Sequence, residues 1–252
     1  MKMKKRSLLW LLPLLLLVVP LLLFGNYVTV FLVDGVFHEP RADAPLGIGS
    51  LNVIKYSMID PTTILSSINQ DDQSIFNFKS GFPPDDPPLV TSVEWKQVDY
   101  VNLATSIFHV AWDESINDWN IYKMAYDTEC DHPDGFYEGE FLYYLETSDN
   151  KKYSARGIRM EPEYGYVWWG GDTYYRRPLF GWKAINLKAM TVTAEEALRR
   201  AEESGGMEAR QSWGDCYISV VMWPEVFGRD DWWVHYRDNN TNDEAVFWIS
   251  AK

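Results

Sequence analysis

The first 33 residues set the strongest limit on how this chain folds. Residues 1–6 carry four positive charges, an apolar run over 8–24 follows, and the next charged side chain is Asp34. A helix needs about 20 mostly apolar residues to cross a bilayer, and the uncharged stretch 8–27 has that length. Because basic residues beside such a helix stay in the cytoplasm, we predict a single-pass protein of the cell membrane. Residues 1–33 are its cytoplasmic tail and transmembrane anchor, and the rest is extracytoplasmic.

A cleaved signal peptide is the alternative interpretation of this segment. Cleavage needs a site of small residues directly after the apolar core. A matching sequence lies well beyond the core, at Ala42-Asp43-Ala44. No cysteine lies near the core, which disfavours a lipoprotein. The sequence therefore favours an uncleaved anchor.

The remaining chain is strongly acidic and rich in aromatic residues. Residues 1–33 hold four of the 23 Lys and Arg and none of the 36 Asp and Glu, so residues 34–252 carry a formal net charge of −17. Nucleic-acid binding requires cations that neutralise phosphates, so no nucleic-acid partner is expected. Aromatic residues make up 15% of the chain, with 12 Trp among them. Large rings pack well on pleated surfaces, which favours a β-rich core.

Cys130 and Cys216 are the two cysteines of the chain. In an oxidising compartment two cysteines most simply pair with each other. Each flanks an expected strand, so we predict a disulfide that joins one sheet to another. Two separate buried thiols are the alternative.

Periodicity divides the extracytoplasmic part into a stem and two units of similar order. Residues 34–92 form the stem, with a short helix after Asp60 and a Pro-rich spacer over 83–88. The units 93–190 and 191–252 each predict one helix followed by antiparallel strands. The expected fold class is therefore α+β, with a transmembrane helix and antiparallel sheets each packed against one helix. The shared order is what a divergent duplication would produce, although coincidence would give the same order.

The expected elements follow from residue spacing. Apolar residues at helical spacing predict a helix over 99–112, and Thr193 with Glu196 predicts a capping box at the start of a second helix that ends at Gly205-Gly206. Alternation predicts the strands, in which Tyr122 shares a face with Met124 and Tyr137 shares a face with Phe141. The strands are expected over 122–126, 137–145, 153–160, 164–169, 216–223, 232–237 and 245–250.

The second unit resembles PepSY-type extracytoplasmic modules. The resemblance lies in the segment 193–206, Thr-Ala-Glu-Glu-Ala-Leu-Arg-Arg-Ala-Glu-Glu-Ser-Gly-Gly, and in the strands Trp233-Val-His-Tyr236 and Val246-Phe-Trp-Ile249. It covers residues 191–252. The resemblance implies one helix packed on a curved sheet and an association with the restraint of secreted peptidases or with sensing.

Acidic residues near Cys130 raise the question of a metal site. The spacing matches positions one, three, five and twelve of an EF-hand loop, occupied by Asp127, Glu129, Asp131 and Glu138. His132 at the sixth position and Pro133 after it exclude a true EF-hand, because the sharp turn there needs Gly. A different calcium loop remains as a weak candidate beside a solvated acidic hairpin, and no metal or cofactor is expected.

Glu138 and Glu140 are the natural candidates for a general acid and base. They lie on one strand face, opposite Phe141 and Tyr143, so alternation predicts that both point to solvent. Glycosidase carboxylates normally come from separate elements across a cleft. No G-x-S-x-G, H-E-x-x-H, P-loop or dinucleotide motif occurs in the chain. We therefore expect no catalytic residues.

Paired tryptophans suggest a binding surface. In each pair, one ring should face the core and the other ring the opposite face, and exposed aromatic patches often mark interaction sites. Burial beneath a second layer is the alternative. The candidate patch consists of Trp168, Trp169, Tyr174, Tyr175, Arg176, Arg177, Trp182, Trp232 and Trp233.

Together these features favour a membrane-anchored, extracytoplasmic, non-catalytic binding or regulatory module with a protein or peptide partner at the cell surface. An extracytoplasmic hydrolase that uses acidic residues and a purely structural domain are the alternatives. A binding module should present an aromatic face, whereas a hydrolase needs a cleft into which carboxylates from different strands converge.

Overall fold

The computed structural model describes most of the chain from residue 95 onward and parts of the chain before it. The described residues are 47–48, 55–60, 64, 76–81, 95–131, 133–148, 152–177, 182–224 and 230–252. The predicted anchor, 1–33, and the spacer, 83–88, lie outside them. Within the described part, no helix combines the length and apolarity that a membrane span requires.

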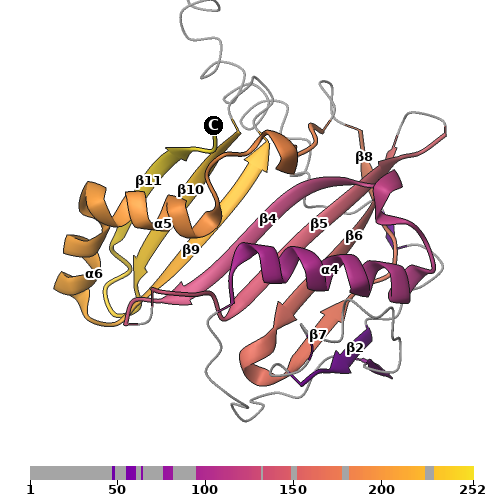
Figure 1. Ribbon diagram of the computed structural model, residues 1–252, viewed down its shortest axis with the longest axis horizontal. Helices are drawn as coiled ribbons and strands as arrows, with labels where there is room; N and C mark the ends of the chain where they lie inside the picture. The colour runs from indigo at the N-terminus through magenta and orange to yellow at the C-terminus, as the bar shows by residue number, and fades with distance from the viewer. Residues whose placement is uncertain are drawn as a thin grey trace, which may run out of the picture. The chain divides into compact units, whose positions relative to one another are not determined.

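One large antiparallel sheet carries the fold, so the α+β class is confirmed (Figure 1). The strands follow the order β11-β10-β9-β4-β5-β6-β7-β2-β3, and β8 pairs with β6 and with β1. Their bounds are β1 Gly47–Ile48, β2 Lys55–Met58, β3 Asn77–Ser80, β4 Asn120–Glu129, β5 Glu138–Glu146, β6 Lys152–Glu161, β7 Tyr166–Trp169, β8 Thr173–Arg176, β9 Cys216–Pro224, β10 Asp230–Asp238 and β11 Glu244–Ser250.

The two predicted units share this sheet, which corrects the expectation of separate sheets. β4 of the first unit pairs with β9 of the second, from Met124 opposite Met222 to Glu129 opposite Tyr217. Local periodicity predicts strands but contains no information about which distant strand becomes a neighbour. The units therefore meet through backbone hydrogen bonds as well as side-chain packing.

The disulfide between Cys130 and Cys216 is confirmed. It connects the end of β4 to the start of β9, with 5.2 Å between the Cα atoms, and the Cys130 amide donates to the Cys216 carbonyl at 2.9 Å. The bond thus joins neighbouring strands of one sheet rather than two sheets, and it lies where the units meet.

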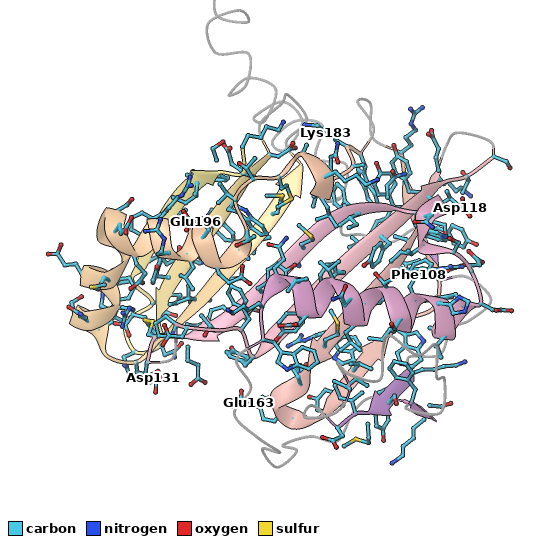
Figure 2. All side chains as sticks on the ribbon, viewed as in Figure 1. Phe108, Asp118, Asp131, Glu163, Lys183 and Glu196 are labelled. Atoms are coloured by element: carbon cyan, nitrogen blue, oxygen red, sulfur yellow. A yellow bond between two sulfur atoms is a disulfide. The ribbon has the colours of Figure 1, made fainter. Side chains whose placement is uncertain are left out.

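Helices α4 (Gln97–Trp112) and α5 (Ala194–Ala201) cover the same face of the sheet (Figure 1). On α4, Leu103, Ile107 and Phe108 are buried at the spacing of one helix face. Figure 2 labels Phe108 on this helix. Tyr100 packs its ring against Gly139 of β5, where a side chain would clash, and its hydroxyl donates to the Phe136 carbonyl at 2.7 Å. The apolar stripe of α4 therefore fixes the helix on β5.

The second helical segment bends at Gly205 instead of ending there. Gly205 has φ +118°, a left-handed conformation that favours glycine. The chain passes through a π-helical turn, Glu202–Gly206, and resumes as α6, Met207–Trp213. The predicted stop at Gly205-Gly206 is thus a kink. The short 3₁₀ turns are η3 Ile116–Asp118, η4 Pro162–Tyr164 and η5 Leu187–Ala189.

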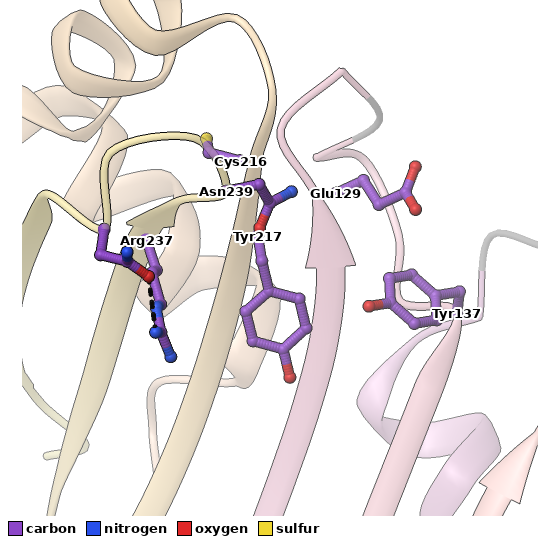
Figure 3. Close-up of a pocket in the computed structure, with 7 residues that line it drawn as sticks. Glu129, Tyr137, Cys216, Tyr217, Arg237 and Asn239 are labelled. Carbon is purple, nitrogen blue, oxygen red and sulfur yellow. Dashed lines mark hydrogen bonds between the residues drawn. The ribbon is translucent and has the colours of Figure 1, made fainter.

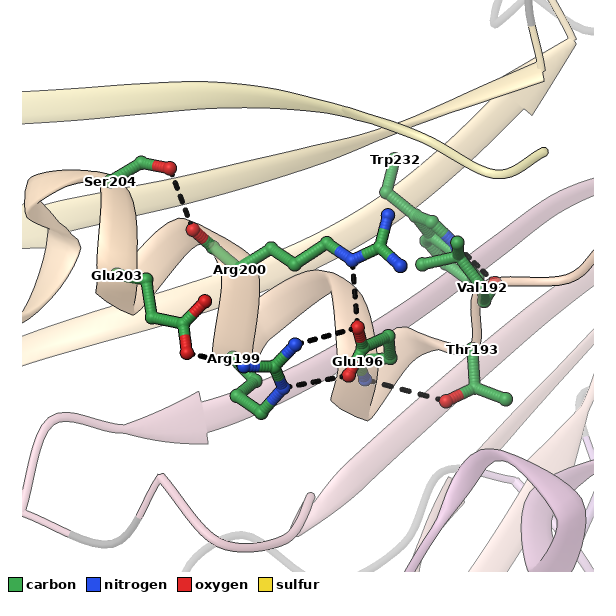
Figure 4. Close-up of polar contacts among 8 residues, drawn as sticks. All are labelled: Val192, Thr193, Glu196, Arg199, Arg200, Glu203, Ser204 and Trp232. Atoms are coloured by element: carbon green, nitrogen blue, oxygen red, sulfur yellow. Dashed lines mark hydrogen bonds and ion pairs between the residues drawn. The ribbon is translucent and has the colours of Figure 1, made fainter.

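The start of α5 is held by several polar contacts (Figure 4). Thr193 Oγ1 accepts from the Glu196 amide at 3.3 Å, so the predicted N-cap is present. The buried Trp232 donates its indole N–H to the Val192 carbonyl at 2.9 Å. Glu196 forms ion pairs with Arg199 and Arg200, which are exposed and contribute little stability.

The first turns of α4 and α5 also cap each other. The Gln97 amide donates to Glu195 Oε1 at 2.5 Å, and the Ala194 amide donates to Gln97 Oε1 at 2.7 Å. The first amides of a helix have no partner within it, so each helix supplies the acceptor that the other lacks. This reciprocal cap ties the two units together a second time.

Candidate functional site

The sheet face opposite α4 and α5, called here the outer face, carries most of the polar side chains of the strands. Along β9, Ile218 and Val220 are fully buried toward the helices, whereas Tyr217 and Ser219 alternate with them on the outer face. β10 follows the same alternation. The helix-facing side is filled by the main core, so the outer face is the side of the sheet that is able to carry a site.

Five aromatic residues pack together and cover part of the outer face. Trp182 stacks on Tyr122 at 4.2 Å and on Tyr153 at 4.7 Å between ring centroids. The Tyr144 hydroxyl donates to the Trp182 carbonyl at 3.0 Å, and burial raises the pKa of Tyr144 to about 12. Tyr175 completes the cluster. This part of the outer face is a second small core.

Tyr122 belongs to this second core, although alternation places it with Met124. A β-bulge between Ile121 and Lys123 shifts the register of β4 against β5, and a bulge turns the residues beside it to a different face. Met124 accordingly lies in the main core and Tyr122 in the second.

Beside the second core lies a groove of about 320 Å³, the glycine groove. Half-buried aromatic residues line it, Trp168 on β7 and Tyr175 on β8. Its floor includes Gly157 and Gly170, where a Cβ atom would meet no atom within 4 Å. The absence of side chains at these two positions therefore leaves space in the groove.

The glycine groove lies where β6 changes its neighbour. β6 pairs with β7 from Ile158 onward and with β8 up to Ala155. Gly157 and the Gly170–Gly171 pair thus fall between the two ladders. Backbone groups at such a junction are able to hydrogen-bond a ligand instead of a neighbouring strand.

Charged groups line one side of the glycine groove. Glu140 pairs with Lys123 at 2.8 Å, and the Arg159 guanidinium lies 5.6 Å from the centre of the Trp168 ring. The indole N–H of Trp168 donates to Glu161 at 3.3 Å. The groove therefore offers aromatic walls together with one acidic and one basic group.

Next to the groove, three carboxylates share one arginine. Asp127 and Glu138 face each other on β4 and β5 and are 8% and 7% exposed. Arg159 contacts Glu138 at 2.5 Å and Glu161 at 2.8 Å. A single guanidinium cannot neutralise three buried carboxylates. We call these four residues the acid cluster.

This imbalance shifts the pKa values of the acid cluster. Burial, together with the nearby Asp127 and Glu161, raises the pKa of Glu138 to about 8, although Arg159 opposes the shift. Burial also raises the pKa of Asp127, against hydrogen bonds from Tyr217 and Ser219. Glu138 therefore binds a proton far more readily than an ordinary glutamate does.

The burial of Glu138 corrects the prediction that its side chain points to solvent. Alternation places Glu138 on the predicted face, but the side chain is buried there rather than solvated. Asp127 and Glu138 line neither of the two cavities described on the outer face.

A second cavity of about 360 Å³, the tyrosine pocket, lies over β4, β9 and β10 (Figure 3). Tyr217 and Tyr137 stand on either side of β4. The rest of the lining consists of Glu129, Cys216, Arg237, Asn239 and Asn242. Tyr137 precedes β5 and lines this pocket, although alternation groups it with the core residue Phe141. The bend before β5 turns its ring away from the core, which residue spacing does not reveal.

The calcium candidates do not come together as a metal site. Asp127 and Glu138 are neighbours in the acid cluster, whereas Glu129 and Asp131 are exposed beyond it. Across the described ranges, no group of three or more His, Cys, Asp or Glu side chains is arranged to hold a metal ion.

The candidate aromatic patch is distributed over several places. Trp169 and Trp232 are in the main core, so each tryptophan pair has one inward ring as predicted. Trp182 is in the second core, Trp168 and Tyr175 line the glycine groove, and Trp233 stacks on His235 at 4.7 Å. Tyr174 is half-buried on β8, and Arg177 pairs with Glu146 at 3.0 Å. The side chain of Arg176 lies outside the described part.

Arg156 is a structural residue that the sequence does not single out. Its guanidinium lies 4.1 Å from the centre of the Trp119 ring. It binds both carboxylate oxygens of Glu114 at 3.0 and 3.1 Å and Asp172 at 2.5 Å. The two carboxylates neutralise the buried charge of Arg156. The Trp119 ring packs against its guanidinium, so this tryptophan has a structural role.

No protein-family model matches the chain, and neither a curated protein nor a solved structure matches it. The resemblance of residues 191–252 to PepSY-type modules therefore stays a prediction.

Proposed function

We propose that this protein is a non-catalytic binding module that holds a peptide segment of an extracytoplasmic protein in the glycine groove. The observation that carries the proposal is a groove lined by Trp168 and Tyr175, in which Gly157 and Gly170 leave space because they have no side chains. Concave sites with aromatic walls and a few polar groups are typical of ligand binding.

A peptide fits the groove better than a rigid ligand. The backbone of Gly170 and Gly171 lies between the β7 and β8 ladders, and main-chain groups of this kind bind extended peptides in other recognition modes. An apolar side chain of the peptide would contact the Trp168 and Tyr175 rings, and Glu140 and Arg159 would select polar neighbours.

The proposed location is the outer side of the membrane, with residues 1–33 as the anchor. The disulfide between Cys130 and Cys216 supports this location, because such bonds persist in oxidising compartments. Alkaline carbonate extraction should leave the full chain in the membrane fraction, and external protease should degrade its C-terminal part. Release by carbonate would contradict the anchor.

The groove is tested by filling it. A displayed peptide library is selected on the purified full chain, and the affinity of the enriched peptide is measured by fluorescence anisotropy. Gly157→Phe should weaken binding by about tenfold or more, because its ring would occupy the groove without a clash at the Cβ position. Gly157→Ala should weaken binding less.

Trp248→Ala is the matched control, since Trp248 is 61% exposed on β11 and away from the groove residues. Circular dichroism and melting curves should show that all variants fold. Failure to enrich any peptide, or equal affinity of the wild type and Gly157→Phe, would overturn the proposal.

A further inference from the structure

The tyrosine pocket is a second cavity that the proposed peptide groove does not use. It shares no lining residue with the groove. Burial and the nearby Asp127 raise the pKa values of Tyr137 and Tyr217, so both rings stay neutral. Both residues line the pocket, and the faces of their rings are electron-rich.

Unsatisfied negative charge lies on the β4 side of this pocket. Glu129 is exposed at the pocket wall and has no ion pair among the described residues. Two residues earlier on β4, Asp127 is 8% exposed and accepts hydrogen bonds from Tyr217 and Ser219, but its Oδ1 atom has no hydrogen-bond partner among the described residues. A cation that enters the pocket would contact Glu129 and would also be attracted by Asp127, which does not line the pocket but accepts a hydrogen bond from the lining residue Tyr217.

The positive charge of the pocket lies on its other side. Arg237 is opposite Tyr217 in the sheet, and Tyr217 is opposite Glu129, so the tyrosine stands between the two charges. Arg237 donates to Asn242 Oδ1 at 2.8 Å and has no carboxylate partner among the described residues. A bound cation would be repelled by Arg237 and would therefore stay on the Glu129 side of Tyr217.

We propose that the tyrosine pocket binds an organic cation, an alkylammonium or guanidinium group, between the Tyr137 and Tyr217 rings and against Glu129. Organic cations are attracted to the faces of aromatic rings, and the net charge of −17 over residues 34–252 attracts cations at long range. A basic peptide side chain and a free polyamine share this chemistry. A metal ion fits less well, because the described side chains include no group of three ligands.

The test is calorimetric titration of the full chain in detergent micelles. N-acetyl-arginine amide represents the peptide side chain, spermidine represents a free polyamine, and N-acetyl-citrulline amide is the neutral isostere of the first. We expect the arginine derivative to bind, the citrulline derivative to bind at least about fivefold more weakly, and the affinities of the arginine derivative and spermidine to show which source the pocket prefers.

Variants that remove one charge test whether the pocket prefers cations. Glu129→Gln should weaken cation binding about fivefold, and Arg237→Gln should strengthen it about twofold. Glu203→Gln is the matched control, because it removes an exposed carboxylate from the helical layer. Gly157→Phe should leave cation binding unchanged, which separates this pocket from the peptide groove.

Several results would overturn the inference. These are no binding of either cation at millimolar concentration, equal binding of the arginine and citrulline derivatives, or the same loss in Glu129→Gln and Glu203→Gln. Loss of cation binding in Gly157→Phe would also overturn it, since the cation would then occupy the groove.

Discussion

At the scale of single residues, Glu138 has the most unusual environment among the acidic residues described above. It is almost completely buried, it faces Asp127 on the next strand, and it shares Arg159 with Glu161. The folded protein therefore favours the protonated form of this carboxyl group.

This preference predicts that stability depends on pH in the neutral range. Because the pKa of Glu138 rises from 4.5 to about 8, the folded state holds a proton there that the unfolded state has already released. The contribution of Glu138 to stability is fully present below about pH 4.5 and is lost as pH rises through 8, with a slope of up to about 1.4 kcal/mol per pH unit. Denaturant unfolding from pH 5 to 9 measures the slope.

Glu138→Gln should flatten this slope, since glutamine does not titrate. Glu140→Gln is the control, because Glu140 lies on the same face of β5 and is 40% exposed at its side chain. An unchanged slope in Glu138→Gln would show that another group is responsible.

At the scale of elements, the sequence predicts strands and helices well where their pattern is local. The strand expected over 216–223 is observed as Cys216–Pro224, and the helix expected over 99–112 is observed as Gln97–Trp112. The pattern fails where one residue shifts the register, as at the bulge that moves Tyr122. The duplication of the two units stays a prediction.

The candidate site was predictable only in part. Trp168 and Tyr175 belong to the predicted patch and line the groove. The groove itself depends on Gly157, whose role follows from the change of strand partner rather than from any motif. Tyr137 and the burial of Glu138 likewise depend on contacts between strands that are distant in sequence.

The reciprocal cap of α4 and α5 gives a prediction for these elements. Gln97→Ala and Glu195→Ala each remove one acceptor from a helix start, and each should lower the free energy of unfolding by about 1 kcal/mol. Because the two contacts hold the same pair of helix ends together, the double variant should show a coupling of about 0.5 kcal/mol or more.

Denaturant unfolding of the four proteins in this cycle measures the coupling. Glu203→Ala is the control for removing an exposed acid beyond the end of α5. Fully additive losses would mean that each helix start is capped independently.

At the scale of the whole molecule, the disulfide stabilises the β4–β9 pairing, where the two predicted units meet. It closes a loop with a sequence separation of 86 residues. Replacing both Cys130 and Cys216 with Ser should therefore lower the free energy of unfolding by about 4 kcal/mol in the chain-entropy model. The unfolding of the wild type should shift on reduction with dithiothreitol, whereas that of the double variant should not. A loss of unfolding free energy below about 1 kcal/mol would show that the β4–β9 pairing is stable without the disulfide.

The pairing of β4 with β9 also determines the order in which the sheet is completed during synthesis. β4 ends at Glu129 and β9 begins at Cys216, and a ribosome takes roughly 4 to 17 s to add the residues between them at the usual rates. During that interval one edge of β4 has no partner strand, and an unpaired edge is a template for aggregation. The nascent chain is thus most vulnerable to aggregation, and most in need of a chaperone, in the seconds before β9 emerges.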